Sequence, residues 1–155
     1  GADGGWMKAV KRPIKNGIDY GYVGDVVEVN GAHLRTLLDN GLTPVIAPIT
    51  FSADGLLLNT NADMVASETA VSLAPDVQLT FCFEKAGVLS NPDDESSLIA
   101  CITPETYTQL KADGIISGGM IPKIDNAFAA IEHGVQSVRI THSNQIQGGT
   151  IIEQA

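Results

Sequence analysis

The sequence predicts an α/β protein in which a mainly parallel sheet lies between two layers of helices. Segments with strand character alternate with helical segments along the chain, which favours a parallel α/β arrangement with right-handed crossovers. The apolar runs at 43–51 and 77–84 are almost continuous, as expected of parallel strands covered on both faces. With 155 residues, the chain is long enough for a real core, and we expect a single domain over residues 1–155. The predicted fold is therefore a three-layer α/β/α sandwich.

The first half of the chain predicts short strands followed by two helices. Strands are expected at 6–12 and 25–29, and Asn30 is expected to cap a helix over 31–40 that ends at Gly41. The apolar face of that helix would consist of Leu34, Leu37 and Leu38. A central strand at 43–51, a turn at 52–55, a brief strand at 56–59 and a helix at 62–73 follow.

The second half repeats the alternation. A buried strand at 77–84 precedes a polar, solvated loop at 90–97. Thr103 and Pro104 are typical of a helix start, and Gly114 of its end. A further helix at 120–133 is expected to end at Gly134, before strands at 137–142 and 148–153.

Composition excludes several classes of function. The formal net charge is −9 and no basic patch appears, which argues against binding to nucleic acid or to anionic membrane surfaces. No apolar run reaches the ~18 residues of a membrane span and no signal-peptide pattern is visible, so we expect a cytoplasmic protein. Cys82 and Cys101 have no zinc-ligand spacing, and we expect both to be buried small hydrophobic residues.

Polar residues gather where the strand at 56–59 gives way to a helix. Asn59, Asn61 and Asp63 lie at this junction. Asparagine and aspartate at a helix start are most often caps. The alternative is a ligand site, because an amide both donates to a carboxylate and accepts from an N–H, which suits an amino-acid-like ligand.

The second junction, at 114–127, holds a lysine where a helix begins. The helix dipole disfavours Lys123 there, which is most simply explained by a nearby anion. Gly118 and Gly119 would let backbone amides approach such a ligand closely. The alternative is a solvated lysine that binds nothing. The phosphate motifs GxxxxGK[ST] and GxGxxG are absent from the sequence, and His33, His133 and His142 are too dispersed to suggest a catalytic role.

Taken together, the two junctions resemble those of the acetylglutamate kinase family in the amino acid kinase superfamily. The blocks "NTNAD" and "GGMIPK" carry the resemblance most specifically. It extends in order over almost the whole chain and includes residues 21–30, 37–49, 59–66, 84–89 and 114–130. It implies an amino acid kinase-like fold, incomplete at the N-terminus.

The resemblance also implies an activity and its residues. Members of the family phosphorylate the side-chain carboxylate of N-acetyl-L-glutamate with ATP, in arginine biosynthesis. By resemblance, Asn59 would bind the acylated amino acid, Asp63 would organise the catalytic lysines and Lys123 would stabilise the transferring phosphoryl group. Mg²⁺ would accompany ATP, and no metal ligand is assigned in the chain. The residues that match nucleotide-binding segments are Glu84, Lys85, Ala86, Gly87, Val88, Leu89, Ile115, Ile116 and Ser117.

The chain also departs from the family pattern. Glu84 stands where aspartate is usual. The family's Lys-x-Gly-Gly strand, its glycine-rich substrate loop and a substrate-binding arginine have no counterpart in the sequence. We therefore expect the chain to be a C-terminal portion, inactive alone and prone to self-association through exposed apolar surface. The intact enzyme is expected to be a homo-oligomer, specifically a dimer.

Three alternatives stay open at this point. The first is a nucleotide-binding or regulatory lobe that has no turnover of its own. The second is a kinase for N-succinyl-L-glutamate, since the residues that contact the acyl group are not in the chain. The third, a kinase for aspartate, carbamate or UMP, is disfavoured by "NTNAD".

Overall fold

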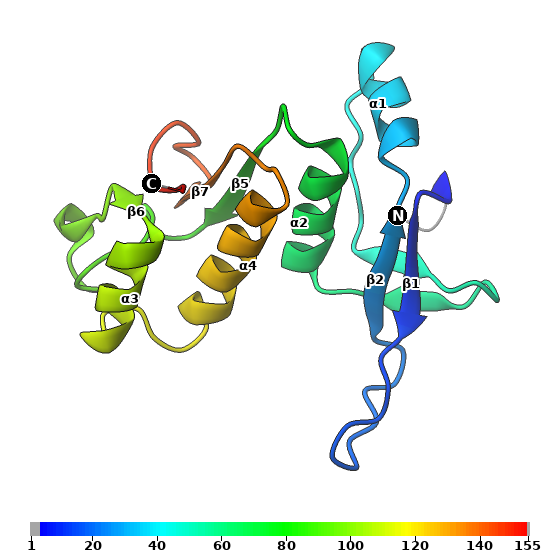
Figure 1. Cartoon of the computed structure of the whole chain (residues 1–155), viewed down its shortest axis with the longest axis horizontal. Helices are drawn as coiled ribbons and strands as arrows, with labels where there is room; N and C mark the ends of the chain where they lie inside the picture. Colours follow the sequence, from blue (N-terminus) through cyan, green and yellow to red (C-terminus); the bar gives the residue numbers. More distant parts are fainter. Residues whose placement is uncertain (1–3, 155) are drawn as a thin grey trace. The chain divides into compact units, whose positions relative to one another are not determined.

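The structure is a computed structural model that describes residues 4–154 as two compact units. The first unit ends at Leu73 and the second begins at Ala74 (Figure 1). Both units contain strands and helices, and each unit holds a four-stranded sheet of its own. The α/β class is therefore confirmed. A single domain over 1–155 stays a prediction, and each unit is described by itself.

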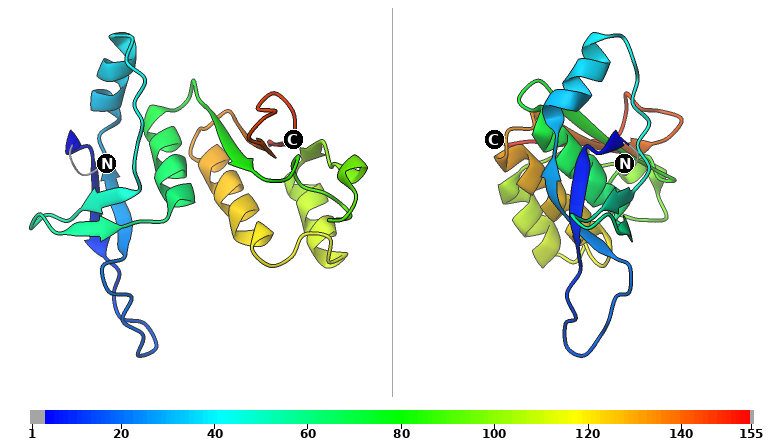
Figure 2. Two further views of the ribbon diagram at one scale, coloured as in Figure 1. Left: turned by 180° about the vertical axis from the view of Figure 1, so that it is seen from behind. Right: turned by 90° about the vertical axis from the view of Figure 1, so that its right-hand side faces the viewer.

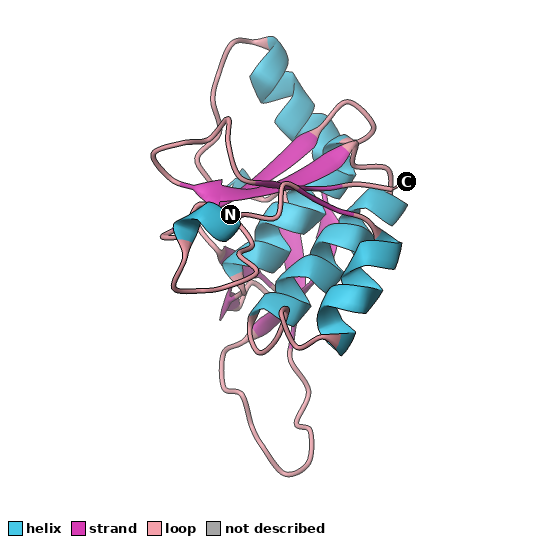
Figure 3. Ribbon diagram, turned by 90° about the vertical axis from the view of Figure 1, so that its left-hand side faces the viewer, coloured by secondary structure: helices cyan, strands magenta, loops and turns pink. Residues whose placement is uncertain are grey.

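The sheet of the first unit is built from four short strands. They are β1 (Met7–Lys11), β2 (Gly24–Val29), β3 (Ile49–Phe51) and β4 (Leu57–Asn59), in the order β2-β1-β3-β4. β1 and β2 form an antiparallel pair, and the residues between them project from the sheet as a long loop (Figure 3). β3 is parallel to β1 and antiparallel to β4.

Two helices complete the first unit. These are α1 (Gly31–Asp39) and α2 (Ala62–Leu73), and a core cluster of Trp6, Met7, Leu34 and Val65 joins them to the sheet. The Asn30 side chain accepts a bond from the His33 amide at 3.0 Å, which confirms the predicted cap. A Cβ at Gly31 would collide with the Ser72 carbonyl oxygen, so glycine permits the close approach of the two helices.

Two predictions for this unit are wrong. The run 43–51 is not a covered central strand, because only Ile49–Phe51 are extended in the sheet and Val45 is 96% exposed. Pro44 and Pro48 have no N–H to donate, which explains why the ladder does not extend through them. Leu38 is exposed rather than part of the buried face of α1.

The sheet of the second unit combines strands from both of its ends. They are β5 (Gln78–Phe83), β6 (Cys101–Ile102), β7 (Ser137–His142) and β8 (Thr150–Ile152), in the order β5-β7-β8-β6. β5 is parallel to β7, β7 is antiparallel to β8, and β8 is parallel to β6. Both sheets thus have mixed strand directions, whereas the sequence predicts a mainly parallel one.

Two helices lie side by side in the second unit, α3 (Pro104–Ala112) and α4 (Met120–Glu132) (Figures 1 and 2). The Tyr107 and Phe128 rings are 5.4 Å apart and join them. Thr103 forms the predicted cap of α3 with Pro104 at its start. The polar loop 90–97 is largely exposed as expected and contains the short 3₁₀ helix η2 (Glu95–Ser97).

The two cysteines also differ from expectation. Cys82 and Cys101 are exposed and not joined in a disulfide. Cys82 is exposed because the side chains of β5 alternate: Leu79 and Phe81 are buried, and Gln78, Thr80 and Cys82 lie on the opposite, exposed face. Within 4–154, every helix is too short or too polar to cross a membrane.

Candidate functional site

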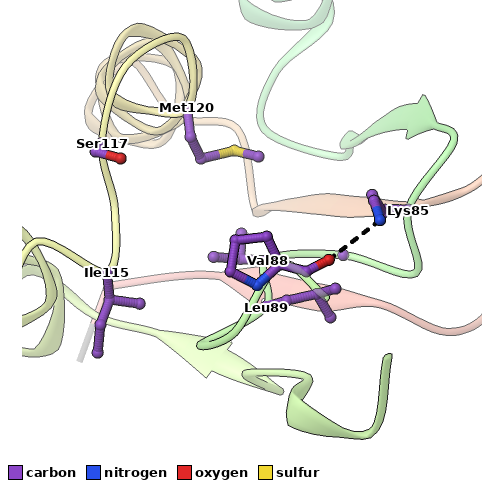
Figure 4. A pocket seen from close by; sticks show the side chains of 8 residues that line it. Lys85, Val88, Leu89, Ile115, Ser117 and Met120 are labelled. Carbon is purple, nitrogen blue, oxygen red and sulfur yellow. Dashed lines mark hydrogen bonds between the residues drawn. The ribbon is translucent and has the colours of Figure 1, made fainter. Parts of the chain in front are cut away.

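A cavity of about 180 Å³ opens where β5 ends in the second unit (Figure 4). One wall is the loop that directly follows β5, and the other is the segment that leads into α4. In Figure 4, Met120 points from the start of α4 toward the cavity, opposite Val88 and Leu89. The lining residues are Lys85, Gly87, Val88, Leu89, Pro92, Ile115, Ser117 and Met120.

Hydrogen bonds at two positions, Lys85 and Val88, hold the loop wall in place. The Lys85 ammonium donates to the Pro92 carbonyl oxygen at 3.1 Å, which ties the loop to the polar excursion beyond it (Figure 4). The fully buried Thr150 hydroxyl accepts from the Val88 amide at 2.8 Å and donates to the Ile99 carbonyl at 2.7 Å. One hydroxyl on β8 therefore fixes the backbone of the cavity wall.

Gly87 allows the loop to approach β8 this closely. A Cβ at this position would lie 2.7 Å from the Thr150 hydroxyl oxygen and 2.9 Å from the Thr150 nitrogen. Real Cβ atoms do not approach backbone atoms to such distances, so any side chain would push the loop from β8. The glycine is thus required by packing inside the cavity wall.

The opposite wall follows the end of α3. The amides of Ile115 and Ile116 both donate to the Leu110 carbonyl, and Ile116 is 2% exposed, which anchors the segment in the core. Gly118 has a φ of +55°, a conformation that residues with a side chain adopt only at a cost. The turn at Gly118 sets the direction in which α4 starts.

Lys123 lies in the first turns of α4, as predicted. Its ammonium nitrogen is 4.3 Å from the centroid of the Phe83 ring. Phe83 is the last residue of β5 and precedes the loop wall of the cavity directly. The ammonium is therefore placed at the carboxyl end of β5.

The structure brings together most of the predicted nucleotide residues. Six of them line the cavity: Lys85, Gly87, Val88, Leu89, Ile115 and Ser117. The other three do not line it, since Glu84 is exposed, Ala86 is half-buried and Ile116 is in the core. Their roles in nucleotide binding stay predictions.

The first predicted junction belongs to the first unit. Asn59 is the exposed last residue of β4, and Asp63 lies in the first turn of α2. The Asn61 side chain accepts from the Met64 amide at 3.1 Å, so Asn61 is a helix cap. The acidic side chain at this end is favoured by the helix dipole.

The chemistry of the cavity suits a ligand with an apolar body and a negative charge. Val88, Leu89, Ile115 and Met120 supply apolar surface, and Lys85 supplies a cation. In the part of the chain that the structure describes, no three His, Cys, Asp or Glu side chains gather to hold a metal ion. The cavity thus combines apolar surface with one ammonium group.

Sequence reasoning missed several residues that shape the site. Pro92 and Met120 line the cavity, Thr150 fixes its wall and Phe83 contacts Lys123. Met120 directly follows Gly118 and Gly119, so its place in the cavity could have been predicted from that glycine pair. Thr150 is 62 positions from Val88, and no local pattern relates two residues so far apart.

Comparisons of the sequence with known proteins agree with the fold. Residues 2–142 match the profile of the amino acid kinase family. The chain is 49% identical to an acetylglutamate kinase from Phocaeicola vulgatus, over 99% of this chain and 61% of that protein. It is 53% identical to one from Cytophaga hutchinsonii, over 94% of this chain and 56% of the relative. The predicted resemblance is confirmed, and the chain spans about three fifths of the length of these relatives.

Solved structures share the fold. The smu.665 protein from Streptococcus mutans is 32% identical, with a TM-score of 0.78, over 96% of this chain and 57% of that one. N-acetylglutamate synthase from Neisseria gonorrhoeae, complexed with coenzyme A and N-acetyl-glutamate, is 24% identical with a TM-score of 0.84. The match covers 97% of this chain and 37% of the synthase chain. Carbamate kinase from Giardia lamblia bound to AMP-PNP is 18% identical with a TM-score of 0.64. The match covers 86% of this chain and 52% of the carbamate kinase chain. These structures share the fold, and the profile match over residues 2–142 shows that the chain belongs to the amino acid kinase family.

Proposed function

We propose that the protein transfers the γ-phosphoryl group of ATP to the side-chain carboxylate of N-acetyl-L-glutamate, as a step of arginine biosynthesis. The observation that carries this proposal is the 49% identity to an acetylglutamate kinase over 99% of the chain. The cavity supports it, because six predicted nucleotide residues line a single space at the end of β5.

The cavity fits one part of such a nucleotide. Its apolar side chains suit the flat face of a base, and Lys85 and the Gly87 backbone suit the polar groups attached to it. The start of α4 offers backbone N–H groups and the positive end of a helix dipole, both of which favour phosphate. Lys123 would add a point charge for the phosphoryl oxygens.

The reaction needs little acid or base chemistry from the protein. A glutamate side-chain carboxylate is ionised at neutral pH, so no general base is required. One carboxylate oxygen forms a bond to the γ-phosphorus while the bond from that phosphorus to the β–γ bridging oxygen breaks, which yields an acyl phosphate and ADP. The chain then has to hold two anions in line and neutralise charge on the equatorial oxygens.

Each predicted residue has a part in this proposal. Asn59 would bind the acylated amino acid through its amide, and Asp63 would keep lysine ammonium groups oriented and charged. Mg²⁺ bound to the ATP phosphates would supply further charge neutralisation when present. An intact homodimer in the cytoplasm stays part of the proposal.

A coupled set of assays tests the activity. The chain is incubated with Mg·ATP and N-acetyl-L-glutamate, N-succinyl-L-glutamate or carbamate, alone and with the unmatched part of the Phocaeicola vulgatus relative added. Acyl phosphate is trapped as the hydroxamate, and nucleotide binding is measured separately by calorimetry. We expect hydroxamate from the acetyl substrate in the mixture with the added part, and none from the chain alone. ATP binding without hydroxamate in any mixture would instead identify a nucleotide-binding lobe. Faster hydroxamate formation with the succinyl substrate would show that N-succinyl-L-glutamate is the substrate.

The Lys123→Ala variant tests the role of the ammonium. We expect kcat to fall by about 10²-fold or more, because the charge acts on the transition state, while the Kd for ATP changes by less than about fivefold. Lys111→Ala is the matched control, since Lys111 also lies over an aromatic ring, at 4.6 Å from Tyr107, but on α3. Loss of ATP binding with kcat intact would contradict this role.

A further inference from the structure

We propose that Phe83 is a positioning residue that holds the Lys123 ammonium for phosphoryl transfer through a cation–π contact. The inference rests on the proposed function, because it assigns a task to the lysine of that site. Its direct observation is the distance of 4.3 Å between the Lys123 ammonium nitrogen and the centroid of the Phe83 ring. This lies well within the range of about 6 Å in which a ring face attracts a cation.

The strand places the ring. Leu79, Phe81 and Phe83 follow at every second position of β5 and share one face of the strand. The Phe81 and Phe83 rings are 6.5 Å apart in a tilted arrangement, and Phe81 is 7% exposed. A buried neighbour thus supports the Phe83 ring at the point where the strand ends.

The helix places the cation. Ile124, adjacent to Lys123 on α4, is 0% exposed and fixes the start of the helix against the core. The ammonium therefore approaches the ring from an anchored element. A lysine side chain has several rotatable bonds, and holding its end before the substrates arrive reduces the ordering required in the transition state.

An aromatic face suits this task for a chemical reason. A ring attracts the ammonium through its quadrupole, and it neither neutralises the charge nor accepts a conventional hydrogen bond from it. The contact with the ring therefore does not reduce the charge that acts on the phosphoryl oxygens. Phe83 also begins the segment that continues into the cavity wall at Gly87, so the same residue links the cation to the nucleotide cavity.

The test replaces Phe83 by phenylalanines of the same shape with one, two or three ring fluorines, which weaken the quadrupole stepwise. The host is the chain, or the complemented mixture, in which hydroxamate formation is measured. We expect kcat to fall in step with fluorination and by about two- to fivefold in Phe83→Leu, with KM for ATP changed less than twofold and with rescue in Phe83→Tyr. The same fluorinated series at Phe128, an aromatic residue of α4 that packs on Tyr107, is the control.

The outcomes separate the two proposals. No hydroxamate from the complemented mixture with Phe83 intact overturns the proposed function and this inference with it. Activity that does not respond to ring fluorination, or responds equally at Phe128, overturns the inference alone. The contact itself is read in the chain by NMR: the Lys123 ε-methylene protons should show an upfield ring-current shift that Phe83→Leu removes, and its absence in the unaltered chain also overturns the inference.

Discussion

Replacing Thr150 by valine tests whether one buried hydroxyl holds the cavity wall. The change removes an acceptor for the Val88 amide, at 2.8 Å, and a donor to the Ile99 carbonyl, at 2.7 Å, in a side chain that is 0% exposed. Each buried group left without its bond costs about 1–3 kcal/mol. The added methyl group returns about 0.8 kcal/mol through burial. We therefore expect the free energy of unfolding of the second unit to fall by about 1–5 kcal/mol.

Two measurements check this value. With a urea dependence of about 1 kcal/mol per M for a unit of this size, the unfolding midpoint followed by circular dichroism should fall by about 1–5 M. Amide exchange at Val88 should accelerate before that of β7 residues such as Val138, because the loop is released first. Thr150→Ser keeps the hydroxyl and should cost about 1 kcal/mol. Equal losses in the serine and valine variants would refute the reasoning, as would a valine variant as stable as the parent.

Two further variants examine the same unit. Gly87→Ala should weaken ATP binding at least tenfold in calorimetry, since its Cβ would meet Leu98 and Thr150 at 2.7 Å; unchanged affinity would show that the loop wall does not contact the nucleotide. Burial, together with the 2.6 Å bond from its hydroxyl to Asp125, raises the pKa of Tyr107. Because the folded pKa is the higher one, that stabilisation is complete below the unfolded value of about 10 and is lost as pH rises above it. Urea titrations should therefore show a steeper alkaline loss of stability than in Tyr107→Phe, and parallel curves would contradict this.

Local patterns predicted the helices well. α2 spans Ala62–Leu73, the predicted 62–73, because apolar positions at helical spacing and polar residues before the start mark both ends. The caps at Asn30 and Thr103 were predicted for the same reason: a side chain three residues from its partner amide is a local feature. Such signals require no knowledge of the tertiary structure.

The strands were harder to predict because burial depends on neighbours. Hydropathy alone predicted a covered strand at 43–51, but the two prolines and the exposed Val45 show that an apolar run is not enough. The strand β5 was located correctly, yet Cys82 is exposed because it lies on the face of the strand opposite the buried Leu79 and Phe81. Which face of a strand is covered depends on long-range packing that hydropathy does not encode.

The candidate site also divides into residues that local motifs predict and residues that only long-range packing brings together. Six of the nine residues predicted to bind nucleotide line one cavity, and their role stays a prediction. The residues that support them were missed, because Thr150 reaches Val88 across 62 positions and Phe83 meets Lys123 only after β5 and α4 have packed. Most residues that line the cavity could thus be predicted from the sequence, and the residues that hold its walls in place could not.

The Phe83 contact also changes the explanation for a cation at the start of α4. The sequence suggested that an anion must be near, because a positive charge at a helix N-terminus costs about 0.3–1 kcal/mol. A ring face at 4.3 Å returns about 0.5–1 kcal/mol, which is the same magnitude with the opposite sign. The fold itself can therefore offset the dipole cost of holding Lys123 here before any nucleotide binds. The attraction between Lys123 and an arriving phosphoryl group would then not have to offset the unfavourable helix dipole. It would contribute to stabilising the transition state instead.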